Sequence, residues 1–277
     1  MKPLAIVSMA GMVLAAAGAA SAADLEIHNA AARVTVIPEA RSDIGVSIVK
    51  ANPRLRIRMM RFGDKVVIDG GLGFRGPDCT NVFGRRGVRI WGTGFIPYDD
   101  LPQIVVRTPL DAKVSASGAV YGVVDRAASL DLSNGGCGDW SVANVAGPLT
   151  VRLAGSGDVR AGDAASVHVH LAGSSDVFVR SARDGLDVAS SGSGNVHAET
   201  MAGPLHVRIA GSGDVTVPAG QVTDMSIAVA GSGDIRFGGV AQNLDATILG
   251  SGDVSVGRVT GKISKRVAGS GSVTIGG

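Results

Sequence analysis

A five-residue motif of the type Gly-Ser-Gly-Asp-Val recurs through the second half of the chain at a nearly constant interval. Eight copies begin at Gly136, Gly155, Gly173, Gly192, Gly211, Gly231, Gly250 and Gly269. Successive first glycines are 18 to 20 residues apart, most often 19. A period that is held this closely over eight copies indicates one structural unit per repeat, stacked in a linear array.

Apolar residues alternate with polar ones on both sides of each motif. Before the motif at Gly155 they are Leu149, Val151 and Leu153, and after it they begin with Val159. Alternation with a period of two predicts strands that bury one face. Equivalent strands stacked about 4.8 Å apart give each backbone amide a partner in the next repeat. The sequence therefore predicts an all-β fold, a single-stranded parallel β-helix (β-solenoid) with about 19 residues per repeat.

The N-terminus has the features of a secretory signal peptide. Lys2 precedes an apolar run from Leu4 to Ala17, and small residues follow at positions 20–23. The run is too short to span a bilayer, which takes about 20 apolar residues, and no second run approaches that length. We therefore expect residues 1–22 to be removed and the mature chain to be exported, to the periplasm, the cell surface or the medium, with no membrane span.

The mature chain is expected to form one continuous domain over residues 24–277. Residues 23–115 contribute N-terminal strands and early rungs, with an irregular insertion near 70–100, and residues 116–277 form the regular solenoid. The formal net charge is only +2. Nucleic acid is thus not an expected partner, since phosphate binding needs a concentrated basic surface.

The paired strand patterns ARVTVIPEARSDIGVSIV and KVVIDGG, then IVVRTPLDAKVSASGAV and the serial GSGDV corners, resemble the autotransporter adhesin head-domain (GIN domain) family of bacterial exported proteins. The resemblance covers roughly residues 30–277. It implies a β-helix in the cell envelope or outside the cell, with no assigned biochemical activity. We expect no translocator segment in this sequence, which is a departure from a complete autotransporter.

The insertion concentrates aromatic side chains, which include Phe74, Trp91, Phe95 and Tyr98. Long loops that carry aromatic residues on a rigid scaffold are common recognition sites, so these four are candidate binding residues. The favoured interpretation is a hydrophobic cap over the open first rung, which stacked arrays need for solubility. One loop could do both.

Three arginines are further binding candidates. Arg54, Arg56 and Arg58 alternate with apolar residues, which predicts that their guanidinium groups share one face of a strand. Such a face could contact an anionic glycan or lipid head group. It could equally be a solvated edge that discourages aggregation.

The chain has two cysteines, Cys79 in the insertion and Cys137 in the first motif. Two cysteines in an exported protein suggest one disulfide. That bond would tie the insertion to the early rungs.

The fourth motif position forms a column of acidic residues on successive rungs. We call this the aspartate column: Asp139, Asp158, Asp176, Asp214, Asp234 and Asp253. Calcium bound between rungs is one interpretation, as in the nonapeptide β-helix repeats. The favoured interpretation is that each carboxylate accepts hydrogen bonds from nearby corner amides, so no cofactor is expected.

A second column, five residues before each motif, places His168, Asp187 and His206 on consecutive rungs. Imidazole, carboxylate and imidazole on one face could bind a metal or act on a polysaccharide. A solvated polar face is the plainer alternative. No GxSxG, HExxH, phosphate-loop or dinucleotide motif is present.

Taken together, these features favour a non-catalytic, adhesin-like binding or scaffolding module that presents a rigid surface to a glycan or an envelope protein. One alternative is a polysaccharide-acting β-helix enzyme that uses His168, Asp187 and His206. Another is a structural protein stiffened by calcium.

Overall fold

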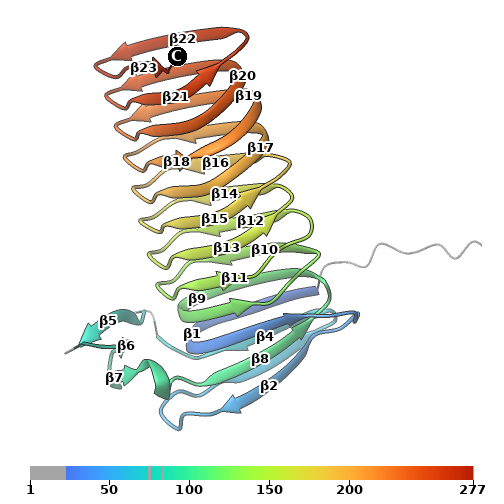
Figure 1. The fold of residues 1–277 in the computed structure, drawn as a ribbon. Helices are drawn as coiled ribbons and strands as arrows, with labels where there is room; N and C mark the ends of the chain where they lie inside the picture. The colour runs from blue at the N-terminus through green and yellow to red at the C-terminus, as the bar shows by residue number, and fades with distance from the viewer. Residues whose placement is uncertain (1–22, 74–75, 83, 277) are drawn as a thin grey trace, which may run out of the picture.

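The computed structural model describes residues 23–73, 76–82 and 84–276. They form a stack of about nine parallel coils with about 19 residues per turn (Figure 1). The β-solenoid predicted from the repeat is confirmed. The expected signal peptide, residues 1–22, lies outside the described residues.

Each regular rung contains a first strand before the glycine corner and a second strand after it. The separate first strands are β10 (Ser129–Asn134), β12 (Leu149–Leu153), β14 (Val167–Leu171), β16 (Leu186–Ser190) and β22 (Ile263–Gly269). The separate second strands are β11 (Trp140–Val142), β13 (Val159–Ala164), β15 (Val177–Ala182), β18 (Val215–Val217), β21 (Val254–Val259) and β23 (Val273–Ile275). Longer strands run through a corner or a bend: β1 (Ala23–Pro38), β9 (Asp111–Val124), β17 (Val196–Ile209), β19 (Ala219–Gly231) and β20 (Ile235–Gly250).

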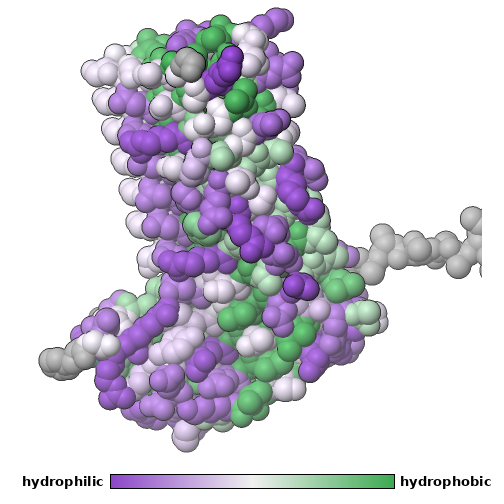
Figure 2. Space-filling view, in the orientation of Figure 1, coloured by the Kyte–Doolittle hydropathy of each residue, from purple (hydrophilic) through white to green (hydrophobic). Residues whose placement is uncertain are grey.

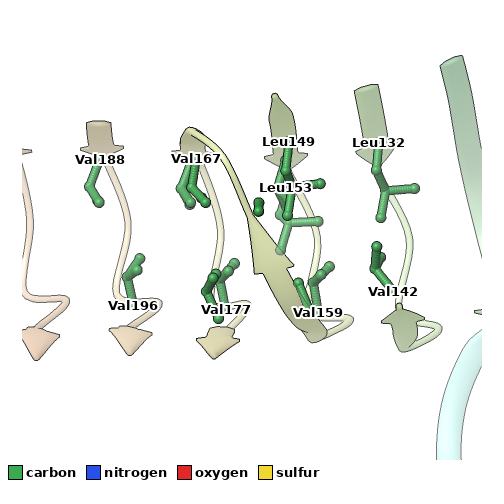
Figure 3. Close-up of a cluster of buried hydrophobic side chains, with 14 of the residues drawn as sticks. Leu132, Val142, Leu149, Leu153, Val159, Val167, Val177, Val188 and Val196 are labelled. Carbon is green, nitrogen blue, oxygen red and sulfur yellow. The ribbon is translucent and has the colours of Figure 1, made fainter. Parts of the chain in front are cut away.

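The core is a narrow column of aliphatic side chains between the first and second strands. Parallel pairing aligns Leu149 with Val167 and Val167 with Leu186, so equivalent inward positions stack directly. Figure 3 shows Leu149 and Val167 facing Val159 and Val177 across the interior. All of these side chains are buried. The alternation in the sequence therefore becomes a continuous core along the rod.

The glycine corners stack too closely to admit a side chain. A Cβ atom added to Gly213 would lie 2.1 Å from the carbonyl oxygen of Gly194 on the preceding rung. No real Cβ contact is that short. The recurrent glycines are thus required by the approach of neighbouring corners.

The first strand is inserted into the stack out of sequence order. β1 pairs in parallel with β9 on one side and with β4 (Lys65–Asp69) and β8 (Gln103–Thr108) on the other. β4 and β8 together make a rung that comes later in the chain but lies outside β1. The expected boundary between residues 115 and 116 falls inside β9, and the rungs continue across it.

Two antiparallel strands form the outermost layer at this end of the rod. β2 (Gly45–Lys50) pairs with β8, and β3 (Arg58–Phe62) pairs with β4. In Figure 1 β2 lies at the bottom of the stack, beyond β8. The repeat therefore ends here in two strands that run against the direction of the rungs.

The opposite end carries a charged side chain at an inward position. Lys265 of β22 pairs with Ala246, which is fully buried in the rung below, so Lys265 occupies an inward position of the end rung, where it stays exposed. Its Nζ donates a hydrogen bond to the carbonyl oxygen of Val273 across the rung, at 3.0 Å. The final described rung thus has a positively charged residue at a position that is apolar in the rung below.

The insertion replaces the glycine corner of the rung made by β4 and β8. It contains a small antiparallel sheet of β5 (Asp78–Val82), β6 (Arg85–Ile90) and β7 (Gly94–Pro97), followed by the short helical turn η1 (Tyr98–Asp100).

In the part of the chain that the structure describes, no helix is long and apolar enough to cross a bilayer.

Candidate functional site

The insertion packs against the side of the rod. Val88, Ile90, Ile96 and Leu101 form a cluster with residues of β1 and β9, separate from the main core. The end of the stack is formed by β2 and β3 instead. The insertion is therefore a lateral cover over the first corners, and the expectation that it caps the open first rung is wrong, because the two antiparallel strands already occupy that position.

A disulfide joins the insertion to the first glycine corner. Cys79 of β5 and Cys137 are bonded, with a Cα–Cα distance of 5.7 Å. The backbone N–H of Cys79 also points to the Cys137 sulfur, at 3.1 Å. This bond holds the small sheet against the solenoid.

Two of the four aromatic candidates are used in packing. The Tyr98 ring meets the Tyr121 ring edge to face, with centroids 5.0 Å apart. The Arg33 guanidinium lies 4.5 Å from the Tyr98 centroid, and burial raises the pKa of the Tyr121 hydroxyl. The Phe95 ring lies over Gly87, where a Cβ would come within 2.5 Å of it.

Trp91 differs from them, because 76% of its surface is exposed. It follows β6 directly, at the tip of the turn that leads to β7. Phe74 lies outside the described residues. Of the aromatic candidates that the structure describes, Trp91 is thus the one presented to solvent.

The arrangement of the three arginines differs from the one predicted. Arg54 lies in a tight turn closed by a bridge between Asn52 and Leu55, and Arg58 is the first residue of β3. Asn52 Oδ1 accepts a hydrogen bond from the backbone N–H of Arg54, at 2.9 Å. The prediction that the three share one strand face is wrong, because Asn-Pro at positions 52 and 53 starts a turn.

The turn nevertheless brings the arginines to one groove with Trp91. Arg54, Arg56 and Arg58 line this groove together with Asp69, Trp91 and the glycine-rich segment 70–73, and its volume is about 360 Å³. We call it the Arg–Trp groove. Within the described ranges, none of the three arginines has a carboxylate within ion-pair distance. The groove is therefore locally cationic, with one aromatic wall.

Asp69 was not a sequence-based candidate. Its backbone lies opposite that of Arg58 in the antiparallel pairing of β3 and β4. Its Oδ1 accepts a hydrogen bond from the N–H of Gly71 at 2.9 Å. Its position at the end of β4, followed by consecutive glycines, is the signal that could have identified it. The groove thus contains one carboxylate oriented by a glycine turn.

The aspartate column is a ladder of hydrogen bonds. Each carboxylate accepts from the backbone N–H of the equivalent residue on the next rung, and Asn195 does the same for Asp214 at 2.9 Å. Among the residues that the structure describes, no group of three His, Cys, Asp or Glu side chains is placed to hold a metal ion. Hydrogen bonding to the corner amides is therefore a sufficient structural reason for an aspartate or asparagine at this position of the repeat.

His168, Asp187 and His206 do occupy neighbouring rungs in register, as the spacing predicts. Asp187 lies 3.8 Å from the Arg208 guanidinium. Asp131 with Arg152 and Asp245 with Arg266 repeat the same diagonal ion pair, each 21 residues apart. The search for sequence motifs did not predict this regular Asp–Arg spacing. Asp187 is one of three aspartates on this face that form the same ion pair with an arginine 21 residues later.

A bidentate ion pair lies on the second-strand face. Arg180 donates from Nε and Nη2 to the two carboxylate oxygens of Asp163, at 2.7 and 2.8 Å, and from Nη2 to Asn144. The hydrogen bonds from Arg180 hold the pKa of Asp163 below its ordinary value. This cluster connects three successive rungs.

A shallow groove also runs over the outside of the first strands. Its floor is a column of small residues such as Ala154, Ala172 and Ala210, with Arg152 and Arg208 beside them, and its volume is about 590 Å³. The sequence signal is the small residue that precedes most motifs. The floor is almost entirely apolar.

The fold and the Arg–Trp groove define a rigid β-solenoid with a lateral, disulfide-anchored insertion, an architecture suited to presenting a surface. The chain matches the model of the family described as "Putative auto-transporter adhesin, head GIN domain" over residues 103–198 and 167–277. The chain belongs to this family. Among curated protein sequences none matches the chain.

Two solved structures align with most of the chain at low sequence identity and low TM-score. One is a putative adhesin from Bacteroides fragilis NCTC 9343, with 14% identity, a TM-score of 0.38 and 92% of each chain covered. The other is a putative cell adhesion protein from Clostridium sporogenes ATCC 15579, with 9% identity, a TM-score of 0.22 and 92% of each chain covered.

Proposed function

We propose that the protein is an exported, non-catalytic, adhesin-like module that binds an anionic glycan in the Arg–Trp groove. The observation that carries the proposal is the convergence of three guanidinium groups and an exposed indole on one groove. Membership of the adhesin head-domain family supports the adhesin-like role.

The groove offers the two kinds of contact that such a ligand needs. Arg54, Arg56 and Arg58 can bind carboxylate, sulfate or phosphate groups through paired N–H donors. The indole of Trp91 is an apolar surface for the C–H face of a sugar ring. Asp69 can accept hydrogen bonds from sugar hydroxyl groups. The groove therefore suits an acidic sugar better than a neutral one.

The other two hypotheses have less support. For an enzyme that uses His168, Asp187 and His206, the key carboxylate has a structural explanation, because Asp187 belongs to the repeated series of Asp–Arg pairs on this face. A calcium-stiffened rod would need oxygen ligands from the aspartate column, where one oxygen of each carboxylate binds a backbone amide of the next rung.

The test is equilibrium binding of the mature chain to a uronic-acid polysaccharide, with neutral dextran as the comparison ligand. A double variant, Arg56→Gln with Trp91→Ala, is expected to weaken binding about tenfold or more, since it removes one charged contact and one stacking surface. Arg160→Gln is the matched control, because Arg160 is an exposed arginine on a second strand away from the groove. Equal binding of dextran, or no effect of the double variant, would refute the proposal.

A further inference from the structure

The end of the rod formed by β2 and β3 exposes an unusual number of apolar side chains. Ile48, Val49, Met59, Met60 and Phe62 are 39 to 65% exposed. They are five of the twelve large exposed hydrophobic residues of the described chain, although β2 and β3 contain only eleven residues. We call these five residues the end face. Apolar patches are also visible over the lower part of the molecule in Figure 2.

The same segment concentrates positive charge. Residues 45–65 contain six basic residues and one acidic residue, a net charge of +5, whereas the whole chain has +2. The six are Lys50, Arg54, Arg56, Arg58, Arg61 and Lys65. Lys50 and Lys65 approach Asp100 and Glu26, and Arg61 donates to the carbonyl oxygen of Ile44. The arginines at 54, 56 and 58 keep their charge unpaired in the described structure.

The position of the end face makes both features available to a flat surface. β2 and β3 each pair through one edge with the rung of β8 and β4, so no further strand covers them among the described residues. The rod extends away from them on the opposite side (Figure 1). The second edge of each strand, with apolar side chains on both sides of it, is therefore open to a partner at this end of the rod.

We propose that the end face docks on the surface of an anionic phospholipid bilayer. A patch with exposed aromatic and aliphatic side chains beside unpaired cations fits the interface of such a bilayer, where apolar groups enter the acyl boundary and Lys or Arg meet lipid phosphates. A second copy is a poorer occupant, because it would bring the net charge of +5 on residues 45–65 against the same charge on its partner. The proposal goes beyond the glycan-binding function, and its apolar residues lie outside the Arg–Trp groove.

The experiment is co-sedimentation of the mature chain with vesicles of phosphatidylcholine, with and without phosphatidylglycerol. Binding is expected with the anionic vesicles and should weaken as salt is raised. The variant Val49→Ser with Phe62→Ser is expected to lower binding about tenfold or more, because two apolar side chains no longer enter the interface. Both side chains are more than 60% exposed, so thermal unfolding should be unchanged.

The matched control is Val240→Ser with Leu249→Ser, which removes two exposed aliphatic side chains of β20, nearer the opposite end of the rod. This control should sediment like the parent chain. Equal loss in both variants, or no preference for anionic vesicles, would overturn the proposal. So would a concentration-dependent dimer that the Val49→Ser, Phe62→Ser variant abolishes, because the occupant would then be a second copy. Retention of uronic-acid binding by that variant separates this test from that of the groove.

Discussion

The backbone N–H of Asp176 donates a hydrogen bond to Oδ1 of Asp158 over 2.9 Å, which joins two neighbouring rungs at their corners. Removing the acceptor with Asp158→Ala is expected to lower the free energy of unfolding by about 1 kcal/mol, since the exposed corner amide of Asp176 loses its hydrogen-bond partner in the protein. Asp158→Asn should be close to neutral, because Asn195 already accepts the equivalent bond from Asp214. Urea unfolding measures both. Equal destabilisation by the two variants would show that charge, rather than the acceptor oxygen, is what matters.

The corner glycines lead to a second prediction, on steric grounds. Gly213→Ala is expected to destabilise the protein by about 3 kcal/mol, because its Cβ would meet the Gly194 carbonyl oxygen at 2.1 Å and the rungs must separate. Gly135→Ala is the control, since the nearest atom to its Cβ would be 3.9 Å away. Thermal melting of both variants checks the difference. Similar melting temperatures would mean that the corner adjusts without cost.

The ion pair between Asp163 and Arg180 predicts that the free energy of unfolding depends on pH in the acid range. Arg180 lowers the pKa of Asp163 from its ordinary value of 3.8. A carboxyl group with a lowered pKa in the folded state contributes stability above the unfolded pKa and loses it as the pH falls through the folded pKa. Arg180→Gln should therefore reduce stability at neutral pH and flatten its fall below pH 3.8. The effect is expected to be small, because both side chains are substantially exposed.

Urea unfolding at a series of pH values tests this prediction, with Arg160→Gln as the control. Parallel pH profiles for the parent chain and Arg180→Gln would contradict it.

The inward lysine of the last described rung gives a fourth prediction. Lys265→Val is expected to promote end-to-end association, because an apolar inward side chain makes this rung resemble an interior one, and inward charges normally discourage edge pairing. Lys262→Val, at an exposed position outside a strand, is the control. Sedimentation velocity over a range of concentrations distinguishes the two. A monomeric Lys265→Val variant would show that other features of this end prevent association.

The regular rungs could be predicted from the sequence because each one repeats the same local pattern of apolar, polar and glycine residues. Alternation around Val151 and the glycines of each corner specify strand, corner and period independently of the rest of the chain. The disulfide partners Cys79 and Cys137 could be named, since no other cysteines compete, but their proximity could not be derived.

The Arg–Trp groove could be predicted only in part. Arg54 and Trp91 were separate candidates, and nothing in the 37 residues between their positions indicates that the turn at Arg54 and the hairpin tip at Trp91 meet. The antiparallel strands β2 and β3 were also beyond a repeat-based prediction, because they lack the motif that sets the direction of the other rungs. Long-range contacts between non-repeated segments carry no periodic signal.

The out-of-order position of β1 has a consequence for how the chain folds during export. All three of its partner strands, β4, β8 and β9, lie later in the sequence, between Lys65 and Val124. Later rungs can add one at a time onto a neighbour completed about 19 residues earlier. At the N-terminal end, β1 must instead form contacts with strands that are far from it in the sequence, and contacts of that kind form more slowly during folding. A chain that emerges N-terminus first therefore keeps its first strand without a complete set of partners until Val124 has followed.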